Sequence, residues 1–308
     1  MKIAVSVLFV FLTLITSSQV LVNNGNHNVL QENYFNPKFI EQNKISRIVG
    51  KVSVKKKLQP INDIGIIKQL SFDDKGALIE KIETFKVGRS NLDTSSILYK
   101  YDDVNQLLSQ TNYHNQAFDG MVYHYDSSGN LAQKDILRGK NLSEYKYQFE
   151  KGSPFLLKTE FYTYEKLNQY EFKKTTFQDK DSPYLETLIK YDSLGNLTAE
   201  FSRYTISNKK SSNEYQYNDF SNLIKVVQSS NLMMKVKIEF SYSYDEFGNV
   251  YEELKKKNGI LIQRRQFLYD PESALLKAEL FMNVKTEEIR IVQYEYQFLN
   301  TITQSDSK

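Results

Sequence analysis

The 308-residue sequence contains no cysteine and no tryptophan, and it has only 5 prolines and 12 glycines. Without cysteine the chain can form no disulfide framework, no thiolate zinc site and no iron–sulfur cluster. The absence of cysteine near residue 20 also excludes a lipid-anchored cysteine at that point. Any folded form must therefore be stabilised by burial and hydrogen bonding alone.

The sequence also lacks an excess of charge of either sign, because 40 Lys and Arg face 37 Asp and Glu, which gives a net charge of +3. A polybasic nucleic-acid binder would carry a strongly basic stripe or domain, so this class is excluded. Hydrophobic residues make up 40% of the chain, with 22 Tyr and 19 Phe. This content is ample for a packed core and excludes an acidic disordered protein.

Residues 1–18 have the features of a secretory signal peptide. Met1-Lys2 is a short positive start, residues 3–15 are almost wholly apolar, and small residues precede Gln19. The apolar run is shorter than the ~20 residues that a membrane-spanning helix needs, and no later segment is more apolar. We therefore predict an exported protein, periplasmic, cell-surface or extracellular, with no membrane span after cleavage.

The rest of the chain divides into three predicted parts. Residues 19–60 form an irregular lead, in which Asn36-Pro37 predicts a short helix and residues 45–55 a first strand. Residues 61–300 form a repeat array, and residues 301–308 a polar tail.

The array repeats one phrase, namely an aromatic residue, Asp, two variable residues, Gly, often Asn, and an aliphatic residue. Clear copies begin at Phe72, Tyr125, Tyr191 and Tyr244, and weaker copies at Tyr101, Phe149, Tyr217 and Tyr269. Such regular spacing marks an array of one supersecondary unit of about 25 residues. Between residues 149 and 191 the count of units is open, since residues 164–170 and 177–184 both resemble eroded turns.

The phrase predicts a tight turn. An Asp side chain accepts backbone N–H groups two residues on, and Gly supplies the positive φ that closes a type I turn with a glycine bulge. The predicted structural turn residues are Asp73, Gly76, Asp126, Gly129, Asn130, Asp192, Gly195, Asn196, Asp245, Gly248 and Asn249.

The segments that enter these turns alternate strictly, as in Phe240, Tyr242 and Tyr244 with polar residues between them. Alternation with a period of two indicates strands with one buried face. We therefore predict an all-β fold, an antiparallel meander of eight or nine hairpins with 16–18 strands. Because open sheets of more than ~10 strands seldom stay flat, we expect a large curved or curled sheet with its aromatic face inward.

The phrase resembles the signature of the YD-repeat (Rhs-like) family of bacterial secreted and surface proteins, over residues 72–296. The resemblance implies the strand-and-turn geometry of that family and a place at the cell surface. In its large members many repeats enclose a C-terminal toxin in a hollow shell. This chain has too few repeats for such a shell and no helical toxin-like tail, so the enclosing function is not expected here.

Few residues suggest chemistry. His114, His124 and Asp126 are expected on one polar face of the hairpin around residues 116–120, where they could bind a metal, and the turn aspartates could bind calcium. No catalytic motif is present and no carboxylate pair stands out. The basic runs at residues 55–57 and 255–257 either protect sheet edges or contact an anionic surface polymer. We predict that the protein is not an enzyme, and that it binds no metal and no cofactor.

The predicted function is that of an exported, non-catalytic β-repeat protein, a binding or structural module at the cell envelope. Its partner is expected to be a surface polysaccharide or an envelope protein, and the binding residues are left open. One alternative is a carbohydrate-active enzyme with an unrecognised carboxylate pair. Another is a small relative of Rhs-type toxin shells.

Overall fold

The computed structural model describes residues 20–22, 35–87, 91–114, 116–143, 150–179, 181–232 and 234–299. The predicted signal peptide and polar tail lie outside the described residues, as do His27 and Phe149.

In these described ranges one short helix precedes 18 strands. The helix, α1 (Pro37–Gln42), begins as the sequence predicts, because the Asn36 side chain accepts a hydrogen bond from the Lys38 amide at 3.1 Å and Pro37 occupies the first turn. The strands are β1 (Ile45–Lys55), β2 (Ile61–Phe72), β3 (Leu78–Val87), β4 (Asn91–Tyr101), β5 (Leu107–His114), β6 (Ala117–Tyr125), β7 (Leu131–Lys140), β8 (Phe155–Lys166), β9 (Glu171–Asp179), β10 (Ser182–Tyr191), β11 (Leu197–Tyr204), β12 (Lys210–Tyr217), β13 (Leu223–Ser230), β14 (Val236–Tyr244), β15 (Val250–Lys257), β16 (Ile260–Tyr269), β17 (Leu276–Asn283) and β18 (Glu288–Phe298).

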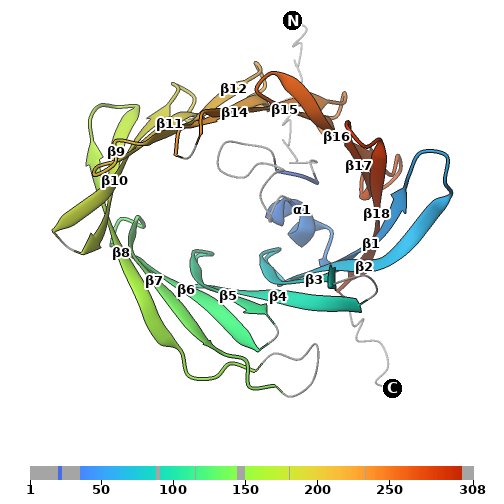
Figure 1. Cartoon of the computed structure of the whole chain (residues 1–308), viewed down its shortest axis with the longest axis horizontal. Coiled ribbons are helices and arrows are strands. Elements are labelled where there is room, and N and C mark those ends of the chain that lie inside the picture. The colour runs from blue at the N-terminus through green and yellow to red at the C-terminus, as the bar shows by residue number, and fades with distance from the viewer. Residues whose placement is uncertain are drawn as a thin grey trace, which may run out of the picture.

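The all-β antiparallel meander is confirmed, and the sheet expected to be curved or curled closes on itself into a barrel. Each strand pairs with its neighbours in sequence, and β1 pairs with both β2 and β18. The sheet therefore closes into a barrel, which Figure 1 shows as a complete ring. Closure gives both edge strands hydrogen-bond partners, so neither edge is left with a row of unpaired backbone groups.

The four clear copies of the repeated phrase form the predicted turn. In the copy at Asp192, the Gly195 amide donates to the Asp192 carbonyl (3.2 Å) and the Asp192 amide to the Asn196 carbonyl (2.9 Å). The Asp192 carboxylate also accepts the Leu194 and Asn196 amides. The glycines of the four turns, Gly76, Gly129, Gly195 and Gly248, all have φ between +76° and +85°. Turn stabilisation thus accounts for the repeated Asp and Gly.

The uncertain interval after residue 149 contains one such turn. Residues 167–170 connect β8 to β9 in a turn, as predicted. Residues 177–184, the other stretch that resembles an eroded turn, span the hairpin between β9 and β10, which lies at the opposite end of the barrel. We call the two ends the turn end, which carries the repeated turns, and the loop end.

The tyrosines of the repeat join neighbouring hairpins at the turn end. In six of them the phenol donates to the carbonyl of the first residue after the preceding turn. The pairs are Tyr101 with Leu78, Tyr125 with Leu107, Tyr217 with Leu197, Tyr244 with Leu223, Tyr269 with Val250 and Tyr296 with Leu276, at 2.5–3.0 Å. The repeat period therefore reflects contacts between units as well as within them.

Removing one of these phenols tests that role. Tyr217→Phe is expected to lower the free energy of unfolding by about 1 kcal/mol, because the part-buried Leu197 carbonyl loses its side-chain donor. The control is Tyr251→Phe on an exposed side chain, which is expected to change stability by less than about 0.5 kcal/mol. Urea unfolding monitored by circular dichroism measures both; equal losses would contradict the role.

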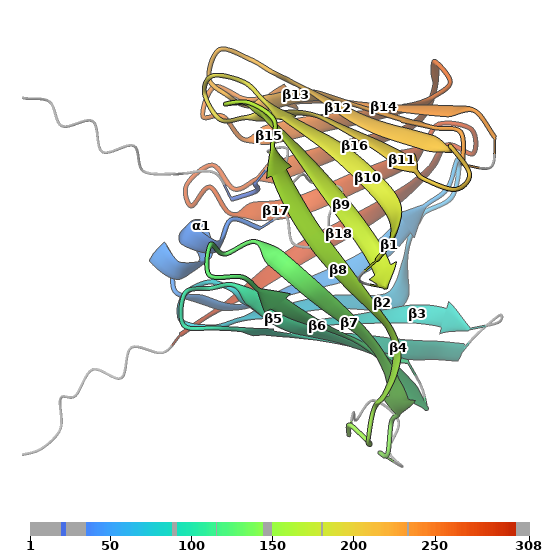
Figure 2. The ribbon, with the colours of Figure 1, turned by 90° about the vertical axis from the view of Figure 1, so that its left-hand side faces the viewer.

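The core lies inside the turn end of the ring. Phe39 and Ile40 of α1 pack in one cluster with strand residues such as Tyr215, Phe240 and Tyr242. Figure 1 shows α1 within the ring, and Figure 2 places it at the turn end. The side chains that share a face with this cluster define the inner face of the barrel, and the alternate residues define the outer face.

The structure holds, within its described residues, no helix with the length and hydropathy that a membrane crossing requires.

Candidate functional site

The arrangement of His114, His124 and Asp126 that could have bound a metal does not form among the described residues. Strand β5 ends at His114 and β6 begins at Ala117, which is paired with it, so His124 lies on the opposite face of the sheet from His114. His114 lies 3.8 Å from Asp119, and His124 lies 3.0 Å from Asp135. The described part of the chain contains no group of three or more His, Asp or Glu side chains able to hold a metal ion.

The basic runs that the sequence singles out are largely paired. Lys56 lies 3.9 Å from Glu288, and Lys57 lies 2.7 Å from Glu287. In the second run, the Lys255 ammonium lies over the Phe240 ring. Carboxylates therefore offset the charge of residues 56 and 57, and these lysines are poor candidates for an anion-binding surface.

Two buried glutamates on the inner face differ in their surroundings. Glu160 accepts hydrogen bonds from Lys134, Lys158, Tyr162 and Tyr184. Burial alone would raise its pKa, but these donors together hold the pKa of Glu160 well below its usual range. Glu160 is thus an ionised centre that links β7, β8 and β10.

Glu253 is the opposite case. The residue is 1% exposed. Among the described residues, one of its carboxyl oxygens has no hydrogen-bond partner, nor has the hydroxyl of Tyr242, its cross-strand neighbour. Burial, and secondarily the charge of Glu279, raise the pKa of Glu253 against the opposing charge of Arg265. Arg265 instead donates to Glu279 at 2.7 Å, and Tyr294 donates to the same carboxylate.

Glu253 and Glu279 are relevant to the alternative that the protein is a carbohydrate-active hydrolase. Glu253 and Glu279 form a carboxylate pair with unlike environments, as acid catalysis would need. Both residues are nearly fully buried on the inner face of the barrel, at 1% and 5% exposure. A polysaccharide cannot reach them in this structure, so the pair does not form a hydrolytic site here.

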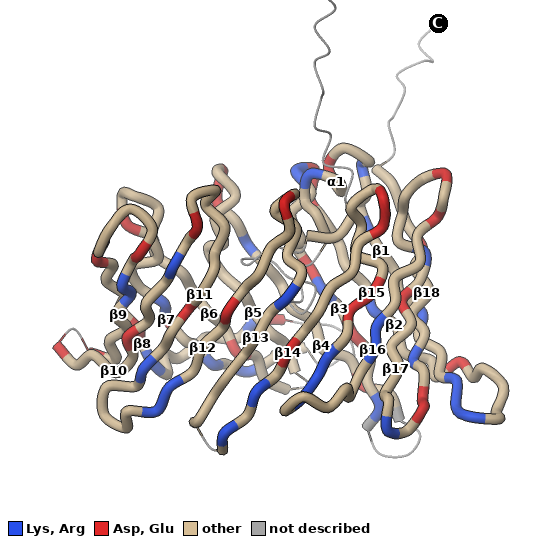
Figure 3. Tube along the Cα trace, turned by 90° about the horizontal axis from the view of Figure 1, so that it is seen from above, with Lys and Arg blue, Asp and Glu red and all other residues tan. Residues whose placement is uncertain are grey.

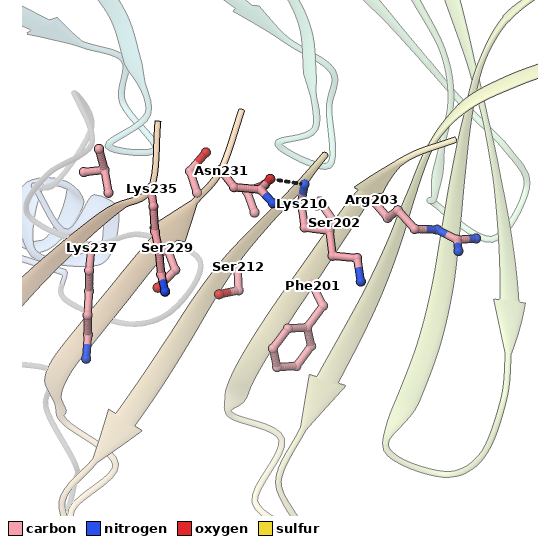
Figure 4. A pocket seen from close by; sticks show the side chains of 12 residues that line it. Phe201, Ser202, Arg203, Lys210, Ser212, Ser229, Asn231, Lys235 and Lys237 are labelled. Atoms are coloured by element: carbon pink, nitrogen blue, oxygen red, sulfur yellow. Dashed lines mark hydrogen bonds between the residues drawn. The ribbon is translucent and has the colours of Figure 1, made fainter. Parts of the chain in front are cut away.

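An open groove lies on the outer face next to the loop end. It encloses about 760 Å³ and extends across β11, β12, β13 and β14 (Figure 4). Strand pairing sets Phe201, Ser212, Ser229 and Lys237 side by side in one cross-strand row. Because the two central strands carry only serine in this row, the surface dips between the larger side chains of β11 and β14. We call this depression the rim groove.

A second row completes the groove. Arg203 of β11 pairs with Lys210 of β12, and the Lys210 amide donates to the Asn231 side chain at 2.6 Å. Lys235 follows in the connection from β13 to β14. The lining thus contains four cations, several hydroxyls, one amide and one aromatic ring, and no carboxylate.

Sequence reasoning did not find the rim groove. Its residues come from four strands and are spread over about 37 positions, without any motif. The one local signal was the repeated Ser-Ser pair, at residues 211–212 and 229–230. Those pairs face each other only because of the strand register.

Comparison with known proteins assigns no family to the chain. No family model matches the sequence, and no curated protein matches it. Among solved structures, a porin-like protein from Bacteroides uniformis aligns at 11% identity with a TM-score of 0.36, covering 82% of this chain and 98% of the other. A porin-like protein from Bacteroides vulgatus aligns at 10% identity and TM-score 0.29, covering 71% and 98%. The solved TcdB2-TccC3-TEV structure aligns at 12% identity and TM-score 0.23, covering 77% of this chain and 18% of that one. Similarity of this extent assigns no function.

Proposed function

We propose that this chain is an exported, non-catalytic protein of the cell envelope that binds a surface polysaccharide through the rim groove. The observation that carries the proposal is the lining of the groove, which combines cations, hydroxyls and an exposed phenyl ring. It includes no His, Asp, Glu or Tyr side chain to serve as a general acid or base. Such a lining favours binding over bond cleavage.

The charged side chains on the outer face of the barrel favour a barrel that is surrounded by water. Ion pairs lie on the outer face in the middle of strands. Glu186, for example, pairs with Lys173 (2.8 Å) and with Arg203 (2.6 Å). Glu239 pairs with Lys225 in the same way, at 3.0 Å. Figure 3 shows both charges distributed along the strands. A lipid-facing Lys or Arg costs about 2–4 kcal/mol near the bilayer midplane, so this wall is poorly suited to hydrocarbon.

The core supports a structural role for the aromatic residues. Sugar-binding proteins often present exposed aromatic rings, but here Tyr215, Phe240 and Tyr242 are buried with α1. Phe201, in contrast, is 41% exposed and lies in the groove. These exposures favour a binding surface on the outer wall rather than on the aromatic inner face.

The test is to screen the mature protein against a panel of envelope polysaccharides, measuring both retention and the length of the recovered chains. We expect retention of at least one polysaccharide with its length unchanged. Shortened products that disappear in a Glu or Asp variant would establish the hydrolase alternative. Absence of retention on every polysaccharide would contradict the proposal.

A further inference from the structure

Of the four cations that line the rim groove, one is paired with a carboxylate of the protein and three are not, within the described residues. Arg203 is paired with Glu186 at 2.6 Å. Lys210, Lys235 and Lys237 are exposed, and in the described part of the chain no carboxylate lies within ion-pair distance of their ammonium groups. This contrasts with Lys56 and Lys57 at the same end of the barrel, which each have a glutamate partner. The groove therefore concentrates positive charge on a chain whose net charge is only +3.

The positively charged rows of the groove are followed, toward the turn end, by a row that contains carboxylates. The next outer-face row toward the turn end contains Glu214 of β12 and Glu239 of β14, which flank Val227. Glu239 is already paired with Lys225, whereas Glu214 is exposed. An anionic ligand is thus attracted to the rows nearest the loop end and repelled by the row beyond them.

The shape and the neutral groups indicate a sugar polymer rather than a compact anion. The groove crosses four strands at ~4.8 Å per strand, so a ligand can extend along it past several sites. The phenyl ring of Phe201 offers a flat apolar surface at one end, and Ser212 and Ser229 offer hydroxyls beside the lysines (Figure 4). A small ion such as phosphate would use neither the length nor the ring.

From these features we propose that the ligand of the rim groove is an acidic polysaccharide, whose carboxylate groups bind Lys210, Lys235 and Lys237 while one sugar ring lies on Phe201. The inference rests on the proposed function and specifies its substrate class. Arg203 is held at the edge of the groove by its ion pair with Glu186, so it is not assigned a ligand carboxylate.

The first experiment measures binding of polygalacturonate oligosaccharides to the mature protein by calorimetry, with neutral dextran oligosaccharides as comparison. We expect binding of the acidic chain only, weakening as salt is raised. The double variant Lys235→Gln/Lys237→Gln is expected to weaken binding at least tenfold, given about fivefold per lysine. The matched control Lys56→Gln/Lys57→Gln removes the same net charge at the same end and is expected to change affinity less than twofold. Equal effects of the two double variants would overturn the assignment to this groove.

Two single variants test the details. Glu214→Gln is expected to tighten binding by about twofold to fivefold, because it removes the repelling carboxylate. Phe201→Ala is expected to weaken polygalacturonate binding about fivefold but to leave the binding of inorganic polyphosphate unchanged, since polyphosphate has no ring to stack. If polyphosphate binds as tightly as the acidic sugar, and Phe201→Ala affects neither, the groove is a general polyanion site and the polysaccharide assignment fails.

The outcome also separates this inference from the proposed function. If the protein retains a neutral envelope polysaccharide and the groove variants weaken that binding, the acidic-ligand inference is wrong while the proposed function stands. If no polysaccharide, acidic or neutral, is retained, both fail. Circular dichroism of each variant confirms that the barrel is intact, which is expected because the substituted side chains are exposed or partly exposed.

Discussion

Gly76→Ala is expected to lower the free energy of unfolding by about 3–5 kcal/mol. A Cβ atom at residue 76 would lie 2.0 Å from the carbonyl oxygen of Pro37 and 2.9 Å from the amide of Glu41, so α1 would have to move. Displacing α1 disturbs Phe39 and Ile40, which are buried in the core, and losing one such side chain costs about 2–5 kcal/mol. The positive φ of residue 76 adds a further penalty of about 1–2 kcal/mol for any L side chain.

The matched control is Gly195→Ala, in the same turn of a later repeat. Gly195 has a φ of +85°, but no atom of the described residues lies within 4 Å of the position that its Cβ would take. The backbone penalty alone is therefore expected, about 1–2 kcal/mol. Urea unfolding followed by circular dichroism measures both variants. Equal losses would show that α1 does not rest on the first turn.

Substitution of Glu160 and substitution of Glu253 are expected to change stability in opposite directions. Glu160→Gln is expected to lower the free energy of unfolding by about 2–4 kcal/mol at pH 7, because Lys134 and Lys158 lose their carboxylate. Glu253→Gln is expected to raise it by about 1–3 kcal/mol at pH 8, because the amide cannot ionise in a buried site that lacks a partner for one oxygen.

The pH dependence follows from the two pKa directions. The pKa of Glu160 is lowered in the folded state, so its stabilisation is present above the ordinary glutamate pKa of about 4.3 and is lost as pH falls below it. The pKa of Glu253 is raised, so the neutral form is retained at low pH without cost, and stability is lost as pH rises from about 4.3 toward the raised value. Unfolding at pH 4 and pH 8 measures this: the effect of each substitution is expected to be smaller at pH 4. A Glu253→Gln variant that is less stable than the natural protein at pH 8 would contradict the role assigned to Glu253.

Local sequence features predicted the local structure well. The bounds of β1, the cap at Asn36 and the turns at Asp73, Asp126, Asp192 and Asp245 each depend on contacts among residues a few positions apart. Prediction from local features was wrong where the result depended on how two strands pair. His114 and His124 were expected on one face of the sheet. In the structure His114 pairs with Ala117, and His124, seven residues further on, therefore lies on the opposite face.

The sequence by itself determined the hairpin unit, because Asp, Gly and alternating aromatic residues fix a turn and a buried face within about 25 residues. Only the tertiary structure decided that β1 meets β18 and that α1 fills the turn end of the ring. It also decided that Phe201, Ser212, Ser229 and Lys237 lie in one row. The physical reason is that closure and register depend on pairing between distant strands, which no short stretch of sequence encodes.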